Sequence, residues 1–169
     1  MDIQLTFFLL FAAGGILSAV LMITRRNPIV AAIYLILNFF CLAGLYLTLN
    51  AQFIAIIQIL VYAGAIMVLV VFVIMLLNLG DPEKLRERWS WKQIVALSVS
   101  FGLLMEIIYI VMISGSELTA DVTRSIQIGT VEYIGNRLFT TFLFPFEITS
   151  LLLTAAIVGA IVLAKKKID

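Results

Sequence analysis

The sequence of 169 residues contains no histidine and only one cysteine, Cys41. Without histidine, the chain cannot supply the axial ligands of a bis-histidine haem or the imidazole ligands of a metal site. A single cysteine can form neither an internal disulfide nor the full set of ligands of an iron–sulfur cluster. No glycine-rich dinucleotide loop follows a predicted strand either. We therefore expect no redox or metal cofactor on this chain, so that any electron transfer takes place on other polypeptides.

Charged residues are also scarce, at 12% of the sequence, whereas soluble domains contain roughly a quarter. Eleven basic residues nearly balance ten acidic ones and occur in short groups, which argues against nucleic acid as a partner. Hydrophobic residues reach 63%, and the mean hydropathy is +1.18. This composition predicts an integral membrane protein that lies in a lipid bilayer.

Five windows are long and apolar enough to span a bilayer as helices, which takes about 20 residues each. They cover residues 3–23, 29–49, 53–77, 94–113 and 142–164. No segment shows the alternating polarity of a membrane β-barrel, and Asn27-Pro28 offers a cap and a first-turn proline for the second window. The sequence thus predicts one all-α membrane domain over residues 1–169, with the first helix retained rather than cleaved as a signal peptide.

The basic residues are distributed unevenly across this five-helix layout. Two of them, Arg124 and Arg137, fall on one side of the predicted domain, and the other nine fall on the opposite side. The nine are Arg25, Arg26, Lys84, Arg86, Arg88, Lys92, Lys165, Lys166 and Lys167. Because basic residues favour the cytoplasmic side, we expect the N-terminus outside and the C-terminus in the cytoplasm. The longest loop, residues 114–141, would then be a connector on the outer face with room for a short helix.

The third window is more than a run of apolar residues. In the stretch from Gln58 to Gly80, QILVYAGAIMVLVVFVIMLLNLG, residues 62–65 interrupt the large aliphatic side chains. Glycine weakens a helix interior by about 1 kcal/mol relative to alanine, and in membrane helices it marks close packing or a departure from regular geometry. About 25 residues give a helix of roughly 37 Å against a hydrocarbon core of about 30 Å, so the segment can tilt or absorb one extra residue as a π-bulge. From the residues alone, small-residue packing is the simpler explanation.

Two blocks of the sequence carry a family resemblance. The block VYAGAIMVLVVFVIMLLNLG resembles the third helix of the J subunit of proton-pumping NADH:quinone oxidoreductase, the bacterial counterpart of mitochondrial chain 6. The block FPFEITSLLLTAAIVGAIVLAKK, residues 144–166, resembles the last helix of that family. The resemblance implies a membrane-arm subunit of complex I, the respiratory NADH dehydrogenase that couples quinone reduction to proton translocation, in the bacterial plasma membrane.

The same resemblance implies where the cofactors and partners lie. FMN, the iron–sulfur clusters and the quinone, such as ubiquinone, would be bound by other subunits, so that this chain is a non-catalytic subunit of the translocase. Its partners would be other membrane-arm subunits, including the quinone-site subunit and small hydrophobic subunits.

In the family, the segment matching the third helix switches between a regular α-helix and a π-bulge. The resemblance implies that Tyr62, Gly64, Met67 and Val68 lie at the bulge. One inserted residue turns everything beyond it by about 100°, because an α-helix has about 3.6 residues per turn. We therefore interpret this helix as a gate that moves bulky apolar side chains, such as those of Met67, Val68 and Phe72, into or out of a hydrated proton path formed with adjacent subunits.

Three polar residues are further candidates for a proton path or a polar contact. Gln58 lies one turn before Tyr62, where related chains often have a carboxylate, so the glutamine argues against direct proton transfer there. Glu147 follows Pro145, which suits the first position of the last helix; the helix dipole would favour a carboxylate in that turn, and contact with a partner subunit is the alternative. Glu106 lies near the middle of the fourth helix, where a charge costs at least about 2.5 kcal/mol. We expect Glu106 to be protonated, or paired through another chain or a cavity water, with a proton relay as the alternative.

Other functions fit parts of this pattern. A related hydrogenase complex or a cation/proton antiporter assembly uses a similar module, and the residues around Tyr62 do not distinguish it. A purely structural assembly subunit would use Gly64 and the neighbouring alanines only as packing contacts. An independent transporter or channel fits less well, because the chain has no paired set of intramembrane charges and no inverted repeat.

Overall fold

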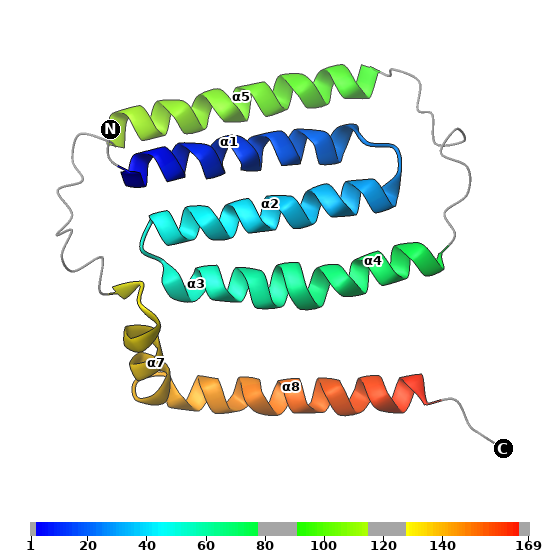
Figure 1. Ribbon diagram of the computed structural model, residues 1–169, viewed down its shortest axis with the longest axis vertical. Helices are drawn as coiled ribbons and strands as arrows, with labels where there is room; N and C mark the ends of the chain where they lie inside the picture. The colour runs from blue at the N-terminus through cyan, green and yellow to red at the C-terminus, as the bar shows by residue number, and fades with distance from the viewer. Residues whose placement is uncertain (1–2, 78–90, 115–127, 166–169) are drawn as a thin grey trace.

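The computed structural model describes residues 3–77, 91–114 and 128–165 of the chain. Regular structure in these ranges is helical, and five helices are long and apolar enough to cross a membrane. The predicted all-α architecture with five spanning helices is confirmed. The elements are α1 (Ile3–Thr24), α2 (Pro28–Thr48), α3 (Gln52–Ile57), η1 (Gln58–Ile66), α4 (Met67–Leu76), α5 (Trp91–Ser114), α7 (Val131–Phe139) and α8 (Leu143–Ala164). The elements α3, η1 and α4 follow one another without a break and form the third spanning helix (Figure 1).

The turns on either side of α2 follow signals in the sequence. Asn27 caps α2, because its side-chain oxygen accepts hydrogen bonds from the backbone N–H groups of Ile29 at 2.9 Å and Val30 at 3.5 Å. Pro28 fits the first turn, where N–H groups have no partner within the helix. After α2, Asn50 adopts a positive φ of 61°, a left-handed conformation that asparagine accepts more readily than most residues. This tight turn makes α2 and the third spanning helix antiparallel neighbours.

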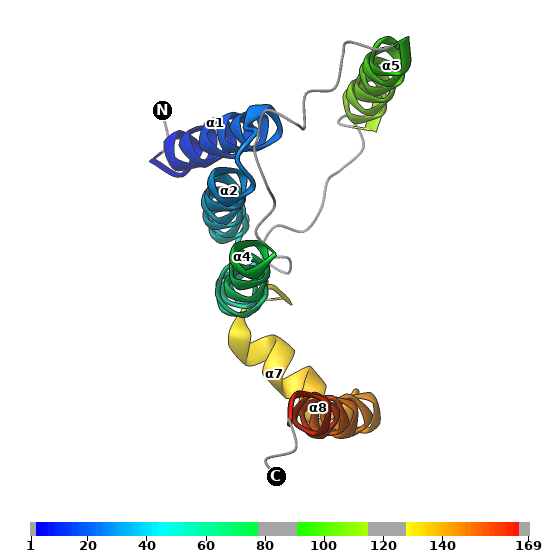
Figure 2. The same ribbon diagram turned by 90° about the vertical axis from the view of Figure 1, so that its right-hand side faces the viewer.

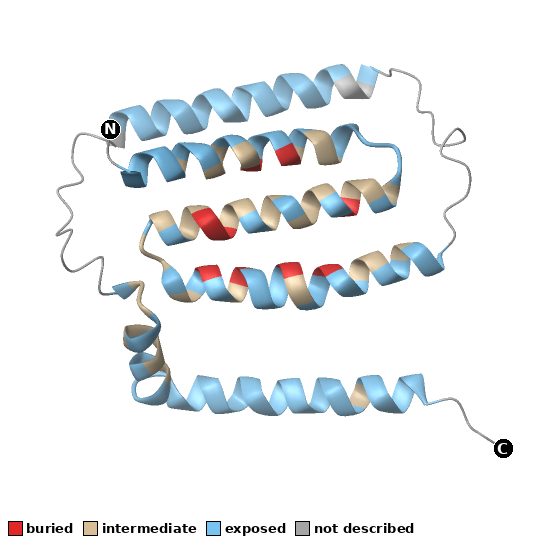
Figure 3. Ribbon diagram, viewed as in Figure 1, coloured by how far each residue is buried: buried red, intermediate tan, exposed pale blue. Residues whose placement is uncertain are grey.

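The helices α1 and α2 and the third spanning helix pack side by side in one layer, with α2 in the middle (Figure 1, Figure 2). The buried residues among those described are confined to this layer, as Figure 3 shows. They are Gly15, Ser18, Ala32, Ala43, Gly44, Ala55, Gln58, Ala63 and Met67. Most of them are small, and small side chains allow the helix backbones to approach closely. Close packing of this kind holds membrane helices together, because the hydrophobic effect does not act between helices in lipid.

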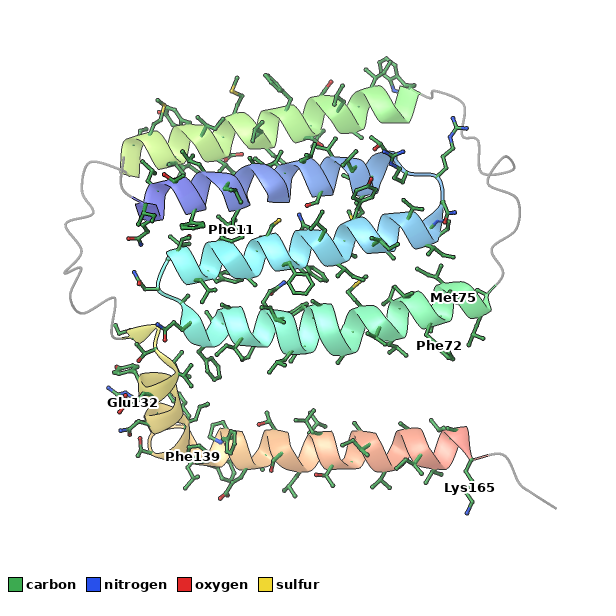
Figure 4. The ribbon with its side chains drawn as sticks, in the orientation of Figure 1. Phe11, Phe72, Met75, Glu132, Phe139 and Lys165 are labelled. Atoms are coloured by element: carbon green, nitrogen blue, oxygen red, sulfur yellow. The ribbon has the colours of Figure 1, made fainter. Side chains whose placement is uncertain are left out.

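Close contact between α1 and α2 depends on Gly44 and Asn38. A Cβ atom at Gly44 would lie 2.6 Å from the ring of Phe11, which lies between the two helices (Figure 4). The side-chain Nδ2 of Asn38 donates to the carbonyl oxygen of Gly15 at 2.7 Å and to the hydroxyl of Ser18 at 3.2 Å. Polar contacts of this kind between membrane helices contribute about 0.6 kcal/mol on average. These contacts hold α1 against α2, and α2 in turn packs against the third spanning helix.

The remaining helices lie outside this layer. The short helix α7 crosses the end of the bundle next to α3, where the N–H of Phe53 donates to the carbonyl oxygen of Gly129 at 3.3 Å. It then leads into α8, and Phe139 packs edge-on against Phe146 with ring centroids 5.0 Å apart. Among the described elements, α8 contacts only α7 and α5 contacts none; Figure 2 shows α5 well to one side of the layer. Both α5 and α8 therefore present apolar sides to lipid or to other proteins.

The described basic residues lie at two ends of the spanning helices. Arg25 and Arg26 occupy the turn between α1 and α2, and Lys165 follows α8 at the same end (Figure 4). Arg137 is on α7, at the opposite end. Other basic residues used for the topology prediction lie outside the described ranges, namely Lys84, Arg86, Arg88, Arg124, Lys166 and Lys167. The side of the membrane on which each end lies stays a prediction.

Candidate functional site

The third spanning helix contains nine residues of π-helix, the element η1 from Gln58 to Ile66. In a π-helix each N–H pairs with the carbonyl group five residues earlier rather than four. At the end of η1 the N–H of Met67 still donates to the carbonyl oxygen of Tyr62, five residues back. Such turns are rare inside α-helices and occur frequently at functional sites. The geometry of η1 therefore makes this helix the candidate functional site.

The π-helix changes which residues of the third spanning helix pack against α2. Its buried residues are Ala55, Gln58, Ala63 and Met67. Residues on one face of an α-helix recur every three or four positions, but five positions separate Gln58 from Ala63. Tyr62 and Ile66, which a continuous α-helix would place on the buried face, are 44% and 43% exposed. Beyond η1 the helix is thus turned by about 100° relative to a continuous α-helix.

Gly64 lies at a crowded point inside η1. A Cβ atom at this position would lie 3.3 Å from the carbonyl oxygen of Ile59, five residues earlier. That oxygen belongs to the backbone of the same π turn, so it cannot rotate away as the end of a side chain could. In a regular α-helix, by contrast, alanine is more stable than glycine by about 1 kcal/mol. A side chain at position 64 would therefore press on the backbone of the π turn, and glycine avoids this contact.

The four residues predicted to lie at a bulge occupy two elements. Tyr62 and Gly64 are within η1, and Met67 and Val68 are the first two residues of α4. The ring of Tyr62 packs edge-on against Phe39 of α2, with centroids 5.7 Å apart and an interplanar angle of 70°. Met67 is buried at 2% exposure, whereas Val68 faces outward. Of these two neighbouring apolar side chains, Met67 is packed inside the layer and Val68 is open to lipid, water or another protein.

The three polar candidates are not brought together. Gln58 is only 8% exposed at the start of η1, and its side-chain amide makes no hydrogen bond with any described residue. Glu106 is exposed on α5, which contacts no other described element. Glu147 is exposed on α8, which contacts only α7 within the described ranges. A proton path through these groups would therefore need water or residues of other proteins between them.

The last helix agrees with the predicted window 142–164, but the placement of Pro145 at its first position was wrong. Helix α8 begins at Leu143, not at Pro145, so Glu147 lies in the second turn rather than the first. The N–H of Phe146 donates to the carbonyl oxygen of Phe142 at 3.0 Å, and Pro145 is accommodated because N–H groups of the first turn need no partner within the helix. Since the effect of the helix dipole falls off within the first turn, it stabilises the carboxylate of Glu147 less than we expected.

One polar surface escaped the sequence analysis, which allowed only for a short helix in the long loop. Helix α7 begins at a Thr130 cap, whose hydroxyl accepts from the N–H of Tyr133 at 3.3 Å. The guanidinium of Arg137 lies 5.4 Å from the ring centroid of Tyr133 and donates to the hydroxyl groups of Tyr133 and Thr141. A cavity of about 580 Å³ is lined by Thr130, Glu132, Tyr133, Asn136, Arg137 and Thr140. Figure 4 shows Glu132 directed away from the spanning helices, as expected for an amphipathic helix at a membrane surface.

Comparison with known proteins identifies the family. Residues 18–163 match the family described as NADH-ubiquinone/plastoquinone oxidoreductase chain 6. The chain belongs to this family. The resemblance inferred from the third and last helices is thereby confirmed over most of the sequence. The described residues contain no cluster of three or more His, Cys, Asp or Glu side chains that could bind a metal ion.

The relatives come from chloroplasts and from bacteria. NAD(P)H-quinone oxidoreductase subunit 6 from the chloroplast of Physcomitrium patens is 36% identical, over 98% of this chain and 86% of its own length. NAD(P)H-quinone oxidoreductase chain 6 from Leptolyngbya boryana is 37% identical, over 98% and 81%. NADH-quinone oxidoreductase subunit J from Rickettsia prowazekii is 33% identical, over 96% and 81%. The similarity therefore covers all five spanning helices of this chain.

Proposed function

We propose that this protein is a membrane-arm subunit of proton-translocating NADH:quinone oxidoreductase, and that η1 couples quinone reduction elsewhere in the complex to proton translocation. The observation that carries the proposal is the five-residue step between the buried residues Gln58 and Ala63. This step sets which residues of the third spanning helix face α2, an arrangement that we call the π register. A continuous α-helix without the step would place other residues against α2, and we call that arrangement the α register. Two discrete registers of one packed helix are the kind of bistable element that a coupling device requires.

The proposed mechanism is a rotation of α4. In the π register Met67 packs on the α2 side and Val68 and Phe72 are exposed; Figure 4 shows Phe72 directed away from α2. In the α register the segment beyond Gln58 turns by about 100°, so that Tyr62 and Ile66 take the places of Ala63 and Met67. The side chains that face the neighbouring space change with it. An apolar side chain that enters a narrow water path removes the water molecules that carry protons, and its withdrawal restores them.

The composition of the helix leaves mostly apolar side chains against α2 in both registers. Nearly all residues from Ile59 to Leu76 are apolar, so each register buries a similar kind of surface against α2. The support on the other side does not need to move, because α1 and α2 are held by the Asn38 hydrogen bonds and by the contact between Phe11 and Gly44. The gate residues carry no proton themselves in this mechanism.

The rest of the complex supplies the chemistry. In this proposal FMN, the iron–sulfur clusters and the quinone are bound by other subunits, and this chain contacts the quinone-site subunit and small hydrophobic subunits in the bacterial plasma membrane. Gln58 hydrogen-bonds to water or a neighbouring helix, and Glu147 contacts a partner subunit. The distribution of basic residues supports an outer N-terminus and a cytoplasmic C-terminus.

Two alternatives give different results in one experiment. A tag on this chain allows the intact assembly to be purified in mild detergent and its subunits to be identified by mass spectrometry. The proposal predicts NADH:quinone oxidoreductase subunits, whereas a hydrogenase or antiporter assembly would yield other partner subunits.

A second experiment introduces Gly64→Leu into the same assembly and measures its subunit content and its proton pumping in vesicles.

The substitution separates coupling from packing. We expect Gly64→Leu to reduce pumping per NADH oxidised in complexes that still contain every subunit. The control is Gly159→Leu on α8, where an added Cβ meets no atom within 4 Å. Loss of assembly with unchanged pumping in the complexes that form would instead indicate a purely structural subunit.

A further inference from the structure

An apolar groove lies between α1, α2 and α4. Its volume is about 280 Å³, and its walls are Met22 of α1, Pro28, Ala31, Ala32 and Leu35 of α2, and Met67, Val70 and Ile74 of α4. All eight residues are buried or half-buried, and together they form a shallow groove between the helices. Its lining residues on α2 extend from position 28 to position 35, which corresponds to about 10 Å along the helix axis. A recess of this length occupies about one third of the hydrocarbon thickness.

The groove begins beside two arginines. Met22 lies in the last turn of α1 and Pro28 is the first residue of α2, and Arg25 and Arg26 form the turn between them. The guanidinium of Arg25 lies 5.6 Å from the ring centroid of Tyr34, whereas Arg26 makes no hydrogen bond with any described residue. Both arginines are exposed. The turn that carries these two exposed arginines is thus next to the end of the groove formed by Met22 and Pro28.

We propose that this groove holds one acyl chain of an anionic phospholipid, with its phosphate bound at Arg26 and Arg25. A phospholipid in the adjoining leaflet has its phosphate at the level of the α1–α2 turn and its chains directed into the hydrocarbon core, which is the arrangement of charge and apolar surface found here. Guanidinium groups bind phosphate through paired hydrogen bonds, and basic sites at the ends of spanning helices attract anionic headgroups. A whole helix, with a diameter of about 10 Å, is too wide for a recess of this volume.

The bound lipid would favour the π register. The α4 wall consists of Met67, Val70 and Ile74, which face the groove only because η1 has shifted the helix by one residue. In the α register Ile66, Leu69 and Val73 take their places, and the recess has different walls. A ligand that fits one of two conformations shifts the equilibrium toward that conformation. This regulatory step rests on the proposed function of η1, whereas binding of the lipid does not.

The binding is tested by photolabelling of the intact purified complex in nanodiscs. The probes are phosphatidylglycerol and phosphatidylcholine, each with a diazirine on one acyl chain. We expect phosphatidylglycerol to label peptides that contain residues 22–35 and 67–74, and Arg26→Gln to weaken this labelling about fivefold. The control Lys165→Gln removes a cation at the same end of α8, away from the groove, and should leave the labelling unchanged.

A second variant tests the groove itself. Ala31→Phe fills the recess and should abolish labelling of residues 67–74, whereas Val162→Phe on the exposed side of α8 should not change it. Equal labelling of this groove by the two probes would overturn the lipid proposal. Labelling that does not change in Arg26→Gln would overturn it as well. These outcomes leave the proposed function intact as long as the complex contains NADH:quinone oxidoreductase subunits and pumps protons. If the complex lacks those subunits, the proposed function fails while the labelling still decides the lipid site.

Discussion

Ala63, and not Tyr62, is the next buried residue after Gln58 in the third spanning helix, although the ring of Tyr62 touches Phe39 of α2 at its edge. The two buried residues are five positions apart, because a π-helix of nine residues replaces the regular α-helix between Gln58 and Ile66. Every residue from Ala63 to Leu76 is displaced by one position around the helix as a result. The packing of α4, the walls of the apolar groove and the exposure of Tyr62 all follow from this displacement.

The first prediction concerns the register. Ala63→Leu places a larger side chain against α2 and should destabilise the protein by about 1–3 kcal/mol, the usual cost of overpacking. Ala65→Leu, two residues further on at an exposed position, should cost less than about 0.5 kcal/mol. The thermal unfolding midpoint of the purified complex and the amount of this subunit in membranes measure the difference. Equal effects of the two substitutions would show that position 63 does not face α2.

A second prediction concerns the support formed by α1 and α2. A Cβ at Gly44 would lie 2.6 Å from the ring of Phe11, so Gly44→Ala should separate the helices and lower the yield of folded subunit. Gly102→Ala on α5, where an added Cβ meets nothing within 4 Å, is the matched control and should be neutral. Combining Gly44→Ala with Phe11→Leu relieves the clash and should restore most of the yield. If the double variant is no better than Gly44→Ala alone, the contact is not what limits the packing.

A third prediction concerns Glu106. Its helix contacts neither η1 nor any other described element, so no route within the described chain joins Glu106 to the third spanning helix. Glu106→Gln keeps the size and polarity of the side chain but cannot carry a proton, and we expect assembly and pumping to remain near the wild-type level. The ratio of proton uptake to NADH oxidation in inverted vesicles is the measurement. A complete loss of pumping with normal assembly would establish a relay at Glu106.

The sequence predicts the five spans well because hydropathy and loop signals act over many residues. Two residues, Asn27 and Pro28, predicted the start of α2. The short connection of residues 50–52 predicted the antiparallel turn after it. The register of the third helix could not, because residues 59–77 are almost uniformly apolar and no polar stripe marks one face. Pro145 was misplaced at the first position of α8 because a proline is compatible with any position of a first turn.

The sequence also could not predict that α5 and α8 lie apart from the other helices. Hydropathy identifies a spanning segment but carries no information about which neighbour covers it, since lipid and protein surfaces are both apolar. Helix α8 reaches its place through α7, whose cap at Thr130 and Tyr133–Arg137 contact were visible in the sequence only as a polar loop. Two exposed spanning helices are expected in a subunit whose neighbours complete the bundle.

The central claim is that energy conversion requires the third spanning helix to change register, and a reversible crosslink tests it most directly. In a chain that also carries Cys41→Ala, the substitutions Phe39→Cys and Tyr62→Cys place thiols where two rings now lie 5.7 Å apart, on α2 and η1. A short bis-methanethiosulfonate reagent joins them, and dithiothreitol releases them; Phe39→Cys alone is the control for modification without a crosslink. The measurement is the initial rate of proton uptake per NADH oxidised in vesicles before and after release. We predict that crosslinked complexes lose most of their pumping and regain it on reduction, whereas unchanged pumping in fully crosslinked complexes would contradict the account.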